Sequence, residues 1–83
     1  MIEIWGKDSC GYCEAAKNLC EIRSYRFNYY KLDRDFTRDE LLEMFPEAKT
    51  FPQIKVSGKH VGGYTEFTRY LEETGYNGTG HSL

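Results

Sequence analysis

The amino-acid sequence predicts one α/β domain in which three helices flank a four-stranded mixed β-sheet. Two observations predict this class. In the first half of the chain, strand-like segments alternate with segments that have the three- and four-residue apolar spacing of helices, as in parallel β-α-β units. In the second half, Ser57 and Gly58 form a two-residue turn signal between two further strands. The expected order is therefore β-α-β-α-β-β-α.

Length and composition fit a single small domain of 83 residues. Hydrophobic residues make up 40% of the chain, which is enough for a core without a structural metal. The net charge is −2 and basic residues are scattered among acidic ones, which argues against binding to nucleic acid or to a membrane surface. We expect a monomeric domain over residues 1–76 and a flexible tail over residues 77–83.

The cellular location is expected to be the cytoplasm. The chain opens on no cationic and apolar leader, and its apolar runs are shorter than a membrane span. Three cysteines are an odd number, which fits a reducing compartment better than a secreted disulfide framework.

The first strand and helix follow directly from apolar spacing. Residues 2–5 alternate as in a short strand, and polar, turn-forming residues follow as far as Ser9. A helix is predicted from Gly11 to about Ser24, with an apolar face formed by Tyr12, Ala15, Ala16, Leu19, Cys20 and Ile22. Cys10 and Cys13 then lie at the N-terminus of this helix.

The second strand and helix are expected over residues 27–32 and from Thr37 to near Pro46. The strand is rich in aromatic residues and should run parallel to the first, because a crossover helix separates the two. Thr37 and Glu40 have the spacing of a capping box, which predicts the start of the second helix.

The remaining elements are a hairpin and a last helix. Residues 52–56 and 59–61 should pair as antiparallel strands. A helix is expected from Tyr64 to about Thr74, with Gly75 as its stop. This arrangement is the plan of the thioredoxin fold.

The cysteine pair has the setting of a redox site. Cys10 and Cys13 are three positions apart at a helix start, with two residues between them, so a reversible disulfide is sterically feasible. The free N–H groups and the macrodipole of the helix stabilise a thiolate on Cys10, which lowers its pKa from about 8.5, and Lys7 acts in the same direction. Asp8 and Glu14 oppose this effect, but solvent screens exposed carboxylates. We expect a net lowering of the Cys10 pKa.

Two other uses of the pair fit the sequence less well. A zinc site needs two further ligands, and neither a second cysteine pair nor a His-x-x-x-His spacing is present, so no metal is expected. A purely structural disulfide fits poorly with a reducing compartment.

Cys20 lies about 10 Å further along the helix than Cys13, beyond the roughly 7 Å Cα limit for a disulfide. Its expected role is that of a small buried hydrophobic residue.

Two later segments, at residues 50–52 and 62–66, complete a recognisable set of motifs. With the cysteine pair, their order and separation make the chain similar to the glutaredoxins, specifically the short bacterial-type dithiol class, over about residues 2 to 74. The resemblance implies a glutathione-dependent thiol–disulfide oxidoreductase that reduces protein disulfides and glutathione mixed disulfides. It also makes ribonucleotide reductase a candidate protein substrate.

The resemblance assigns roles to individual residues. Cys10 matches the nucleophile and Cys13 the resolving thiol. Phe51, before a proline that is cis in the family, matches the residue whose backbone N–H and C=O bind the cysteinyl part of glutathione. Lys7 matches a partner of the glycyl carboxylate, and Gly63 a point of close approach. The implied glutathione site consists of Lys7, Tyr12, Thr50, Phe51, Pro52, Gly63, Tyr64, Thr65 and Glu66.

The sequence departs from the family's commonest pattern at three positions. Gly11 stands where proline is usual, Phe51 replaces a smaller β-branched residue, and Glu66 is one methylene longer than the usual aspartate. Some members without that proline carry a [2Fe–2S] cluster bridged between protomers through the nucleophilic cysteine and glutathione, so a cluster carrier that uses Cys10 is one alternative. A thioredoxin-like donor recharged by a flavin reductase is another, and a zinc-binding interaction module is the third.

Overall fold

The computed structural model describes residues 1–76. Its elements follow one another in the predicted order and are β1 (Ile2–Gly6), α1 (Gly11–Ile22), β2 (Phe27–Lys31), α2 (Arg38–Met44), β3 (Gln53–Val56), β4 (Lys59–Gly62) and α3 (Tyr64–Thr74). The predicted tail over residues 77–83 lies outside the described residues, and the extent of the domain stays a prediction.

The four strands form one mixed sheet in the order β2-β1-β3-β4. β1 pairs in parallel with β2 and antiparallel with β3, so that Ile4 lies between Tyr29 and Ile54. β3 and β4 form the predicted antiparallel hairpin. Its turn residues, Ser57 and Gly58, have φ angles of 52° and 83°, as a two-residue hairpin turn requires. These pairings confirm the predicted thioredoxin fold.

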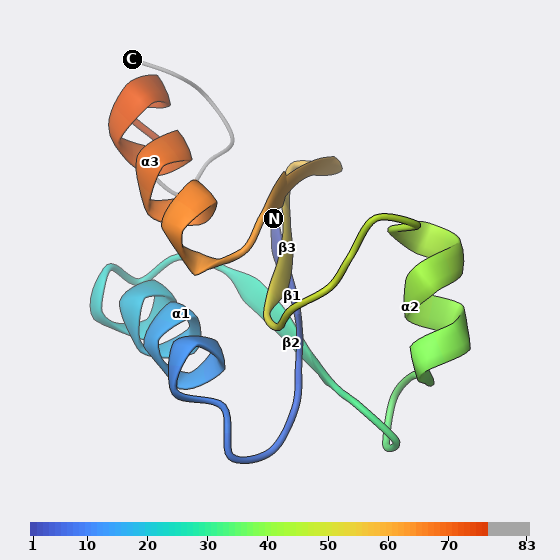
Figure 1. Ribbon diagram of the computed structural model, residues 1–83. Helices are drawn as coiled ribbons and strands as arrows, with labels where there is room; N and C mark the ends of the chain where they lie inside the picture. Colours follow the sequence, from blue (N-terminus) through green and yellow to red (C-terminus); the bar gives the residue numbers. More distant parts are fainter. Residues whose placement is uncertain (77–83) are drawn as a thin grey trace.

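Helices cover both faces of the sheet. α1 and α3 lie side by side on one face, and α2 lies alone on the other (Figure 1). Alternation along β1 explains the division, because Ile2 and Ile4 point to the α1 and α3 side while Trp5 points to the α2 side. The buried core on the α1 and α3 side consists of Ile2, Ile4, Ala16, Cys20, Tyr25, Ile54, Val56, Phe67, Leu71 and Tyr76. The smaller cluster on the α2 side consists of Trp5, Phe36, Leu41 and Phe45.

The predicted apolar face of α1 was wrong at two positions. Tyr12 is 65% exposed and Ile22 is 82% exposed, whereas Cys13 is fully buried. Cys13, Ala16 and Cys20 form a narrow stripe against the sheet. At about 100° per residue, Tyr12 lies beside this stripe and Ile22 nearly opposite to it. The helix also ends at Ile22, earlier than expected.

The second helix begins as its capping box predicts. The Glu40 N–H donates to Thr37 Oγ1 over 3.2 Å, and the Thr37 N–H donates to Glu40 Oε1 over 2.9 Å. These reciprocal bonds satisfy two N–H groups that the first turn would otherwise leave free. None of the helices described in residues 1–76 is long and apolar enough to cross a membrane.

Candidate active site

The two cysteines form a disulfide at the start of α1. Cys10 is the N-cap residue and Cys13 lies in the first turn, with their Cα atoms 5.2 Å apart. Cys13 is fully buried, whereas Cys10 is only half-buried. The Cys13 N–H donates to Cys10 Sγ over 3.2 Å. The sulfur that a substrate can reach therefore also has the helix N–H donor beside it.

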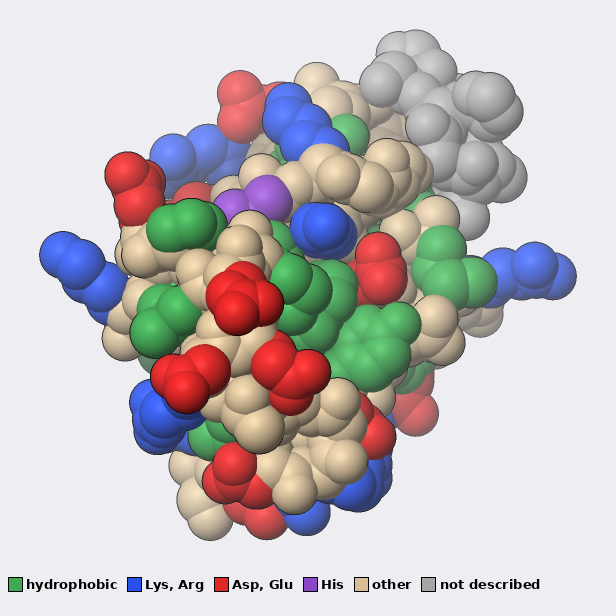
Figure 2. All heavy atoms as spheres, turned by 90° about the vertical axis from the view of Figure 1, so that its right-hand side faces the viewer, with side chains coloured by type: hydrophobic (Ala, Val, Ile, Leu, Met, Phe, Trp, Pro, Cys, Tyr) green, Lys and Arg blue, Asp and Glu red, His purple; other side chains and the backbone are tan. Residues whose placement is uncertain are grey.

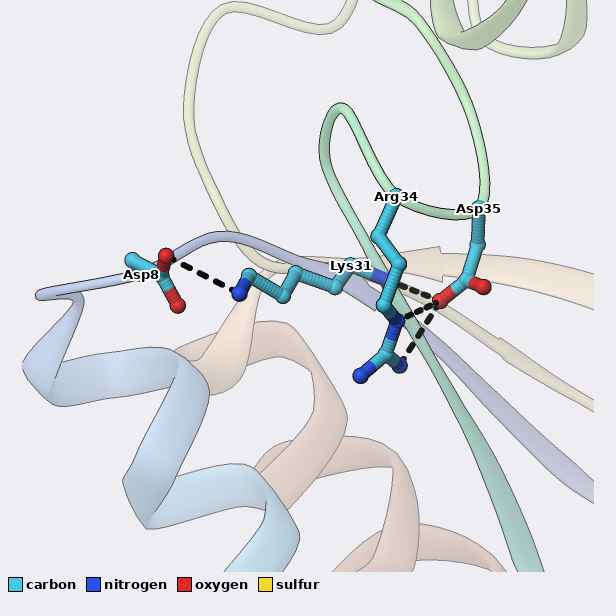
Figure 3. A network of polar contacts seen from close by, with 4 residues as sticks. All are labelled: Asp8, Lys31, Arg34 and Asp35. Atoms are coloured by element: carbon cyan, nitrogen blue, oxygen red, sulfur yellow. Dashed lines mark hydrogen bonds and ion pairs between the residues drawn. The ribbon is translucent and has the colours of Figure 1, made fainter.

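Polar contacts hold the loop before the disulfide against the end of β2 (Figure 3). Lys31 Nζ lies 3.0 Å from Asp8 Oδ2, and the backbone N–H of Lys31 donates to Asp35 Oδ2 over 2.8 Å. Arg34 donates to the same Asp35 oxygen, and this pairing lowers the pKa of the Asp35 carboxyl. Lys31 thus places a positive charge beside Asp8, whose carboxylate would otherwise oppose a thiolate on Cys10.

The segment before β3 lies next to the disulfide. The peptide bond between Phe51 and Pro52 is cis, as the resemblance implies. The Phe51 carbonyl oxygen is 3.9 Å from Cys10 Sγ. Within residues 1–76, the Phe51 N–H and C=O take part in no backbone hydrogen bond. They remain available to an incoming extended chain.

A groove of about 270 Å³ lies beside these groups. Tyr12 and Tyr64 stack across it from the starts of α1 and α3, with ring centroids 5.8 Å apart and planes inclined by 26°. Three distant chain segments contribute to its wall, which consists of Tyr12, Thr50, Phe51, Pro52, Gly63, Tyr64, Thr65 and Glu66. Of the nine residues that the sequence grouped together, the fold therefore brings eight to one groove.

The α3 end of the groove is shaped by a glycine pair and a carboxylate. Glu66 Oε1 accepts a hydrogen bond from the Gly63 N–H over 2.8 Å. Gly62 has a φ of 117°, and a Cβ there would come within 3.1 Å of the Glu66 side chain. The sequence predicts a role for Gly63, whereas the positive φ that favours glycine is at Gly62. The adjacent Gly-Gly pair before a helix was the available signal.

Cations flank the other end of the groove. Lys7 Nζ lies 5.6 Å from the centroid of the Phe51 ring, and the Arg38 guanidinium lies 5.9 Å from it. Lys7 is the predicted site residue that does not line the groove itself. Arg38 was missed, and with Lys49 it lines an adjoining hollow of about 110 Å³ that shares Thr50 and Phe51 with the groove. The charge along the site therefore changes from positive beside Phe51 to negative at Glu66.

The third cysteine belongs to the core. Cys20 is fully buried, and burial, followed by the charge of Glu21, raises the pKa of its thiol to about 11. A thiol with such a pKa is almost entirely protonated at neutral pH and is unreactive. No group of three or more His, Cys, Asp or Glu side chains in the part of the chain that the structure describes is arranged to hold a metal ion.

A disulfide-capable cysteine pair at a helix start, beside a cis-proline in this fold, defines a thiol–disulfide oxidoreductase of the thioredoxin-fold superfamily. The family model named Glutaredoxin matches residues 2–61, and the chain belongs to the glutaredoxin family. Glutaredoxin 1 of Escherichia coli (strain K12) is 35% identical over 77 residues, which cover 84% of this chain and 91% of that protein. Glutaredoxin 1 of Salmonella typhimurium is 36% identical over 77 residues, covering 84% and 88%.

Solved structures agree with this assignment. Reduced glutaredoxin from Escherichia coli superimposes with a TM-score of 0.75 at 32% identity, over 87% of this chain and 93% of that one. A buckwheat glutaredoxin in complex with glutathione superimposes with a TM-score of 0.74 at 25% identity, over 87% of this chain and 68% of that one. Glutathione is the reductant of the family.

Proposed function

We propose that this protein is a glutathione-dependent oxidoreductase that reduces protein disulfides and glutathione mixed disulfides through Cys10 and Cys13. The single observation that supports this most strongly is the groove beside Cys10. It combines an unpaired backbone edge at Phe51 with opposite charges at its two ends. Such a site suits a short, extended peptide with charged termini.

Cys10 is the proposed nucleophile because of its exposure and its neighbours. In the reduced protein, the α1 N–H groups stabilise its thiolate, and the N–H of Cys13 is already 3.2 Å from the sulfur. Cys13 is fully buried behind it, so a substrate disulfide meets Cys10 first. Cys13 is therefore assigned the resolving role.

The proposed cycle balances in thiols and disulfides. The Cys10 thiolate attacks a substrate disulfide, forms a mixed disulfide and expels one substrate thiolate. Cys13 then attacks Cys10 Sγ, releases the second substrate thiol and leaves the Cys10–Cys13 disulfide. One glutathione thiolate opens this disulfide to give a glutathione–Cys10 mixed disulfide. A second glutathione attacks the glutathione sulfur, restores the dithiol and leaves as oxidised glutathione.

The charges of glutathione match those of the groove. Lys7 and Arg38 would bind the glycyl carboxylate at the Phe51 end. The N–H and C=O of Phe51 would pair with the cysteinyl residue as an added strand. Glu66 would attract the γ-glutamyl ammonium group, and the first N–H groups of α3 the carboxylate. The glutathione complex of the buckwheat relative supports this assignment.

The same reaction extends to protein substrates. Proteins with exposed disulfides require both cysteines, while glutathionylated proteins require only Cys10, because a second glutathione can resolve the intermediate. We include ribonucleotide reductase among the proposed protein substrates on the family resemblance alone. Its turnover with glutathione and this protein as electron source is the direct assay.

The test compares the rates at which single cysteine variants reduce two substrates with glutathione. Cys10→Ser should abolish the reduction of a glutathione mixed disulfide and of a protein disulfide. Cys13→Ser should keep the first activity and lose most of the second. Cys20→Ser is the matched control and should keep both. Equal loss of both activities in Cys13→Ser would contradict the assigned roles.

Outcomes with other reductants or cofactors separate the remaining hypotheses. Reduction of the oxidised protein by a flavin reductase, with no response to glutathione, would contradict the proposal and favour a thioredoxin-like donor. A brown, glutathione-dependent dimer after anaerobic reconstitution would identify an iron–sulfur carrier. Stoichiometric zinc with unfolding by chelators would identify a binding module.

A further inference from the structure

Gln53 is the one polar residue buried among residues 1–76, with 5% of its surface exposed. It directly follows the cis-proline at the edge of the groove and begins β3. A buried amide is tolerated only when its donor and acceptor groups are paired. The partners of Gln53 therefore indicate why the fold accepts it there.

Two hydrogen bonds satisfy the Gln53 side chain. Its Nε2 donates to the Thr50 carbonyl oxygen over 2.7 Å, and its Oε1 lies 2.8 Å from His60 Nε2. A carbonyl oxygen can only accept, so the NH₂ group must face Thr50. Oε1 then faces His60, whose Nε2 carries the hydrogen. The orientation of the amide is thus determined by its two neighbours.

His60 is itself held in place. Its ring stacks on Phe45 with centroids 4.1 Å apart and planes inclined by 28°. It lies on β4, where it projects toward the buried end of the Gln53 side chain. A continuous series of contacts therefore connects Phe45, through His60 and Gln53, to the Thr50 carbonyl.

The Thr50 carbonyl shares a peptide plane with the Phe51 N–H. That bond is trans, since the cis bond in this segment joins Phe51 to Pro52. In a trans peptide the C=O and the N–H point in opposite directions. When Gln53 binds the carbonyl from the buried side, the Phe51 N–H must point away from Gln53. Its direction is thereby set by a side chain that does not reach the groove, because Gln53 is absent from the groove wall.

We propose that Gln53 is a positioning residue for thiol–disulfide exchange, which holds the Thr50–Phe51 peptide so that the Phe51 N–H faces the substrate backbone. His60 supports it by orienting the Gln53 amide. This inference rests on the proposed glutathione-dependent function. It predicts that loss of the Gln53 hydrogen bonds weakens substrate binding without changing the reactivity of Cys10.

The test measures KM and kcat for a glutathione mixed disulfide, together with the Cys10 pKa from thiolate absorbance. Gln53→Met keeps the length of the side chain and removes both hydrogen bonds. We expect KM to rise roughly 3- to 10-fold, the equivalent of a lost hydrogen bond, with kcat and the Cys10 pKa unchanged. His60→Phe keeps the ring on Phe45 and removes only the Nε2 donor, so a smaller rise of about 2-fold is expected.

Two further variants keep the test decisive. Ile54→Val, the next residue on β3, should lower stability by about 0.5 to 1.5 kcal/mol and leave KM unchanged. Gln53→Glu retains the acceptor for His60, loses the donor to Thr50 and sets an oxygen atom against the Thr50 carbonyl, so it should raise KM at least as much as Gln53→Met. If the Gln53 variants do not fold, the exposed position of His60 allows His60→Phe to test the same contact.

The outcomes distinguish the inference from the function on which it rests. An unchanged KM in the Gln53 variants, or an equal rise in Ile54→Val, would overturn the positioning role and leave the proposed function intact. A wild-type protein that shows no saturable reaction with the mixed disulfide would overturn both. A rise in KM confined to the Gln53 and His60 variants supports the inference.

Discussion

The two faces of the sheet differ in how they are packed. On the α1 and α3 side, ten buried residues form the core, and most are aliphatic or fully enclosed. On the α2 side the buried cluster has four residues, of which three are aromatic, and α2 itself buries only Leu41. Leu42 and Met44 of α2 are 44% and 42% exposed. Figure 2 shows this side, where hydrophobic side chains lie among charged ones at the surface.

This difference separates the reactive group from the cationic part of the recognition site, which lies beside Phe51. The large core includes Ala16 and Cys20, and α1 also carries the fully buried Cys13, so the sulfurs stand on the most enclosed part of the fold. Arg38 and the Phe51 ring lie on the α2 side, where the buried cluster is smaller. A rigid support suits the geometry of sulfur exchange, while an accessible rim suits contacts with varied partners.

The largest expected effect comes from the larger core. Phe67→Ala should lower the free energy of unfolding by about 3 to 5 kcal/mol, because the surrounding residues cannot collapse into the cavity. Phe36→Ala on the α2 side should cost less, about 3 kcal/mol at the lower end of this range, since its buried neighbours are fewer. Urea denaturation measures both. Equal losses would show that the two faces are packed alike.

The next effect concerns the cysteines. In the reduced protein, Cys20 should react with iodoacetamide at least about 100-fold more slowly than Cys10 at neutral pH, because burial raises its pKa to about 11. Mass spectrometry of the modified peptides gives the two rates. Addition of denaturant should expose Cys20 and remove most of the difference. Comparable rates in the folded protein would argue against a rigid core around α1.

A smaller effect is expected at Lys7 and Arg38, the two cations beside the Phe51 ring, which form the cationic rim of the groove. Arg38→Gln and Lys7→Gln should each raise KM for a glutathione mixed disulfide about 2- to 5-fold, and the increase should shrink at high salt. Lys17→Gln is the control, because Lys17 lies over the Tyr29 ring and away from the groove. A KM as sensitive to Lys17 as to Arg38 would point to net charge in place of a defined rim.

The smallest effect is the pH dependence of stability on the α2 side. Partial burial of the ring, which is otherwise exposed, and then the charge of Lys55 lower the pKa of His60 below its ordinary value. As the pH falls through the titration range of an unperturbed histidine, the unfolded chain therefore binds more protons than the folded protein does. The contribution of His60 to the free energy of unfolding is fully present above about pH 7 and decreases toward about pH 5. His60→Phe should reduce this decrease in urea denaturation. An unchanged slope would assign the decrease to other groups.

Local patterns predicted the elements well. The capping box of Thr37 and Glu40, the turn at Ser57 and Gly58, and the stop at Gly75 all depend on residues within a few positions of one another. The prediction for α1 was wrong at Tyr12 and Ile22, because apolar spacing alone does not say how wide a stripe the sheet will cover. Tyr12 is instead exposed at the groove, where it stacks on Tyr64.

By itself, the sequence determined the order of the elements, the cysteine pair at a helix start and most of the groove wall, since short-range geometry and recognisable motifs encode these. Only the tertiary structure decided that Arg38 reaches Phe51, that Gly62 must remain glycine, and that Gln53 holds the Thr50 carbonyl. The contact of Arg38 with Phe51 depends on the packing of separate elements, while the requirement at Gly62 comes from the conformation of the turn between β4 and α3. Gln53 has a local partner in Thr50, but its second partner is His60 on the neighbouring strand. The physical reason is that the function of a side chain depends on the groups it faces, and tertiary packing determines which groups those are.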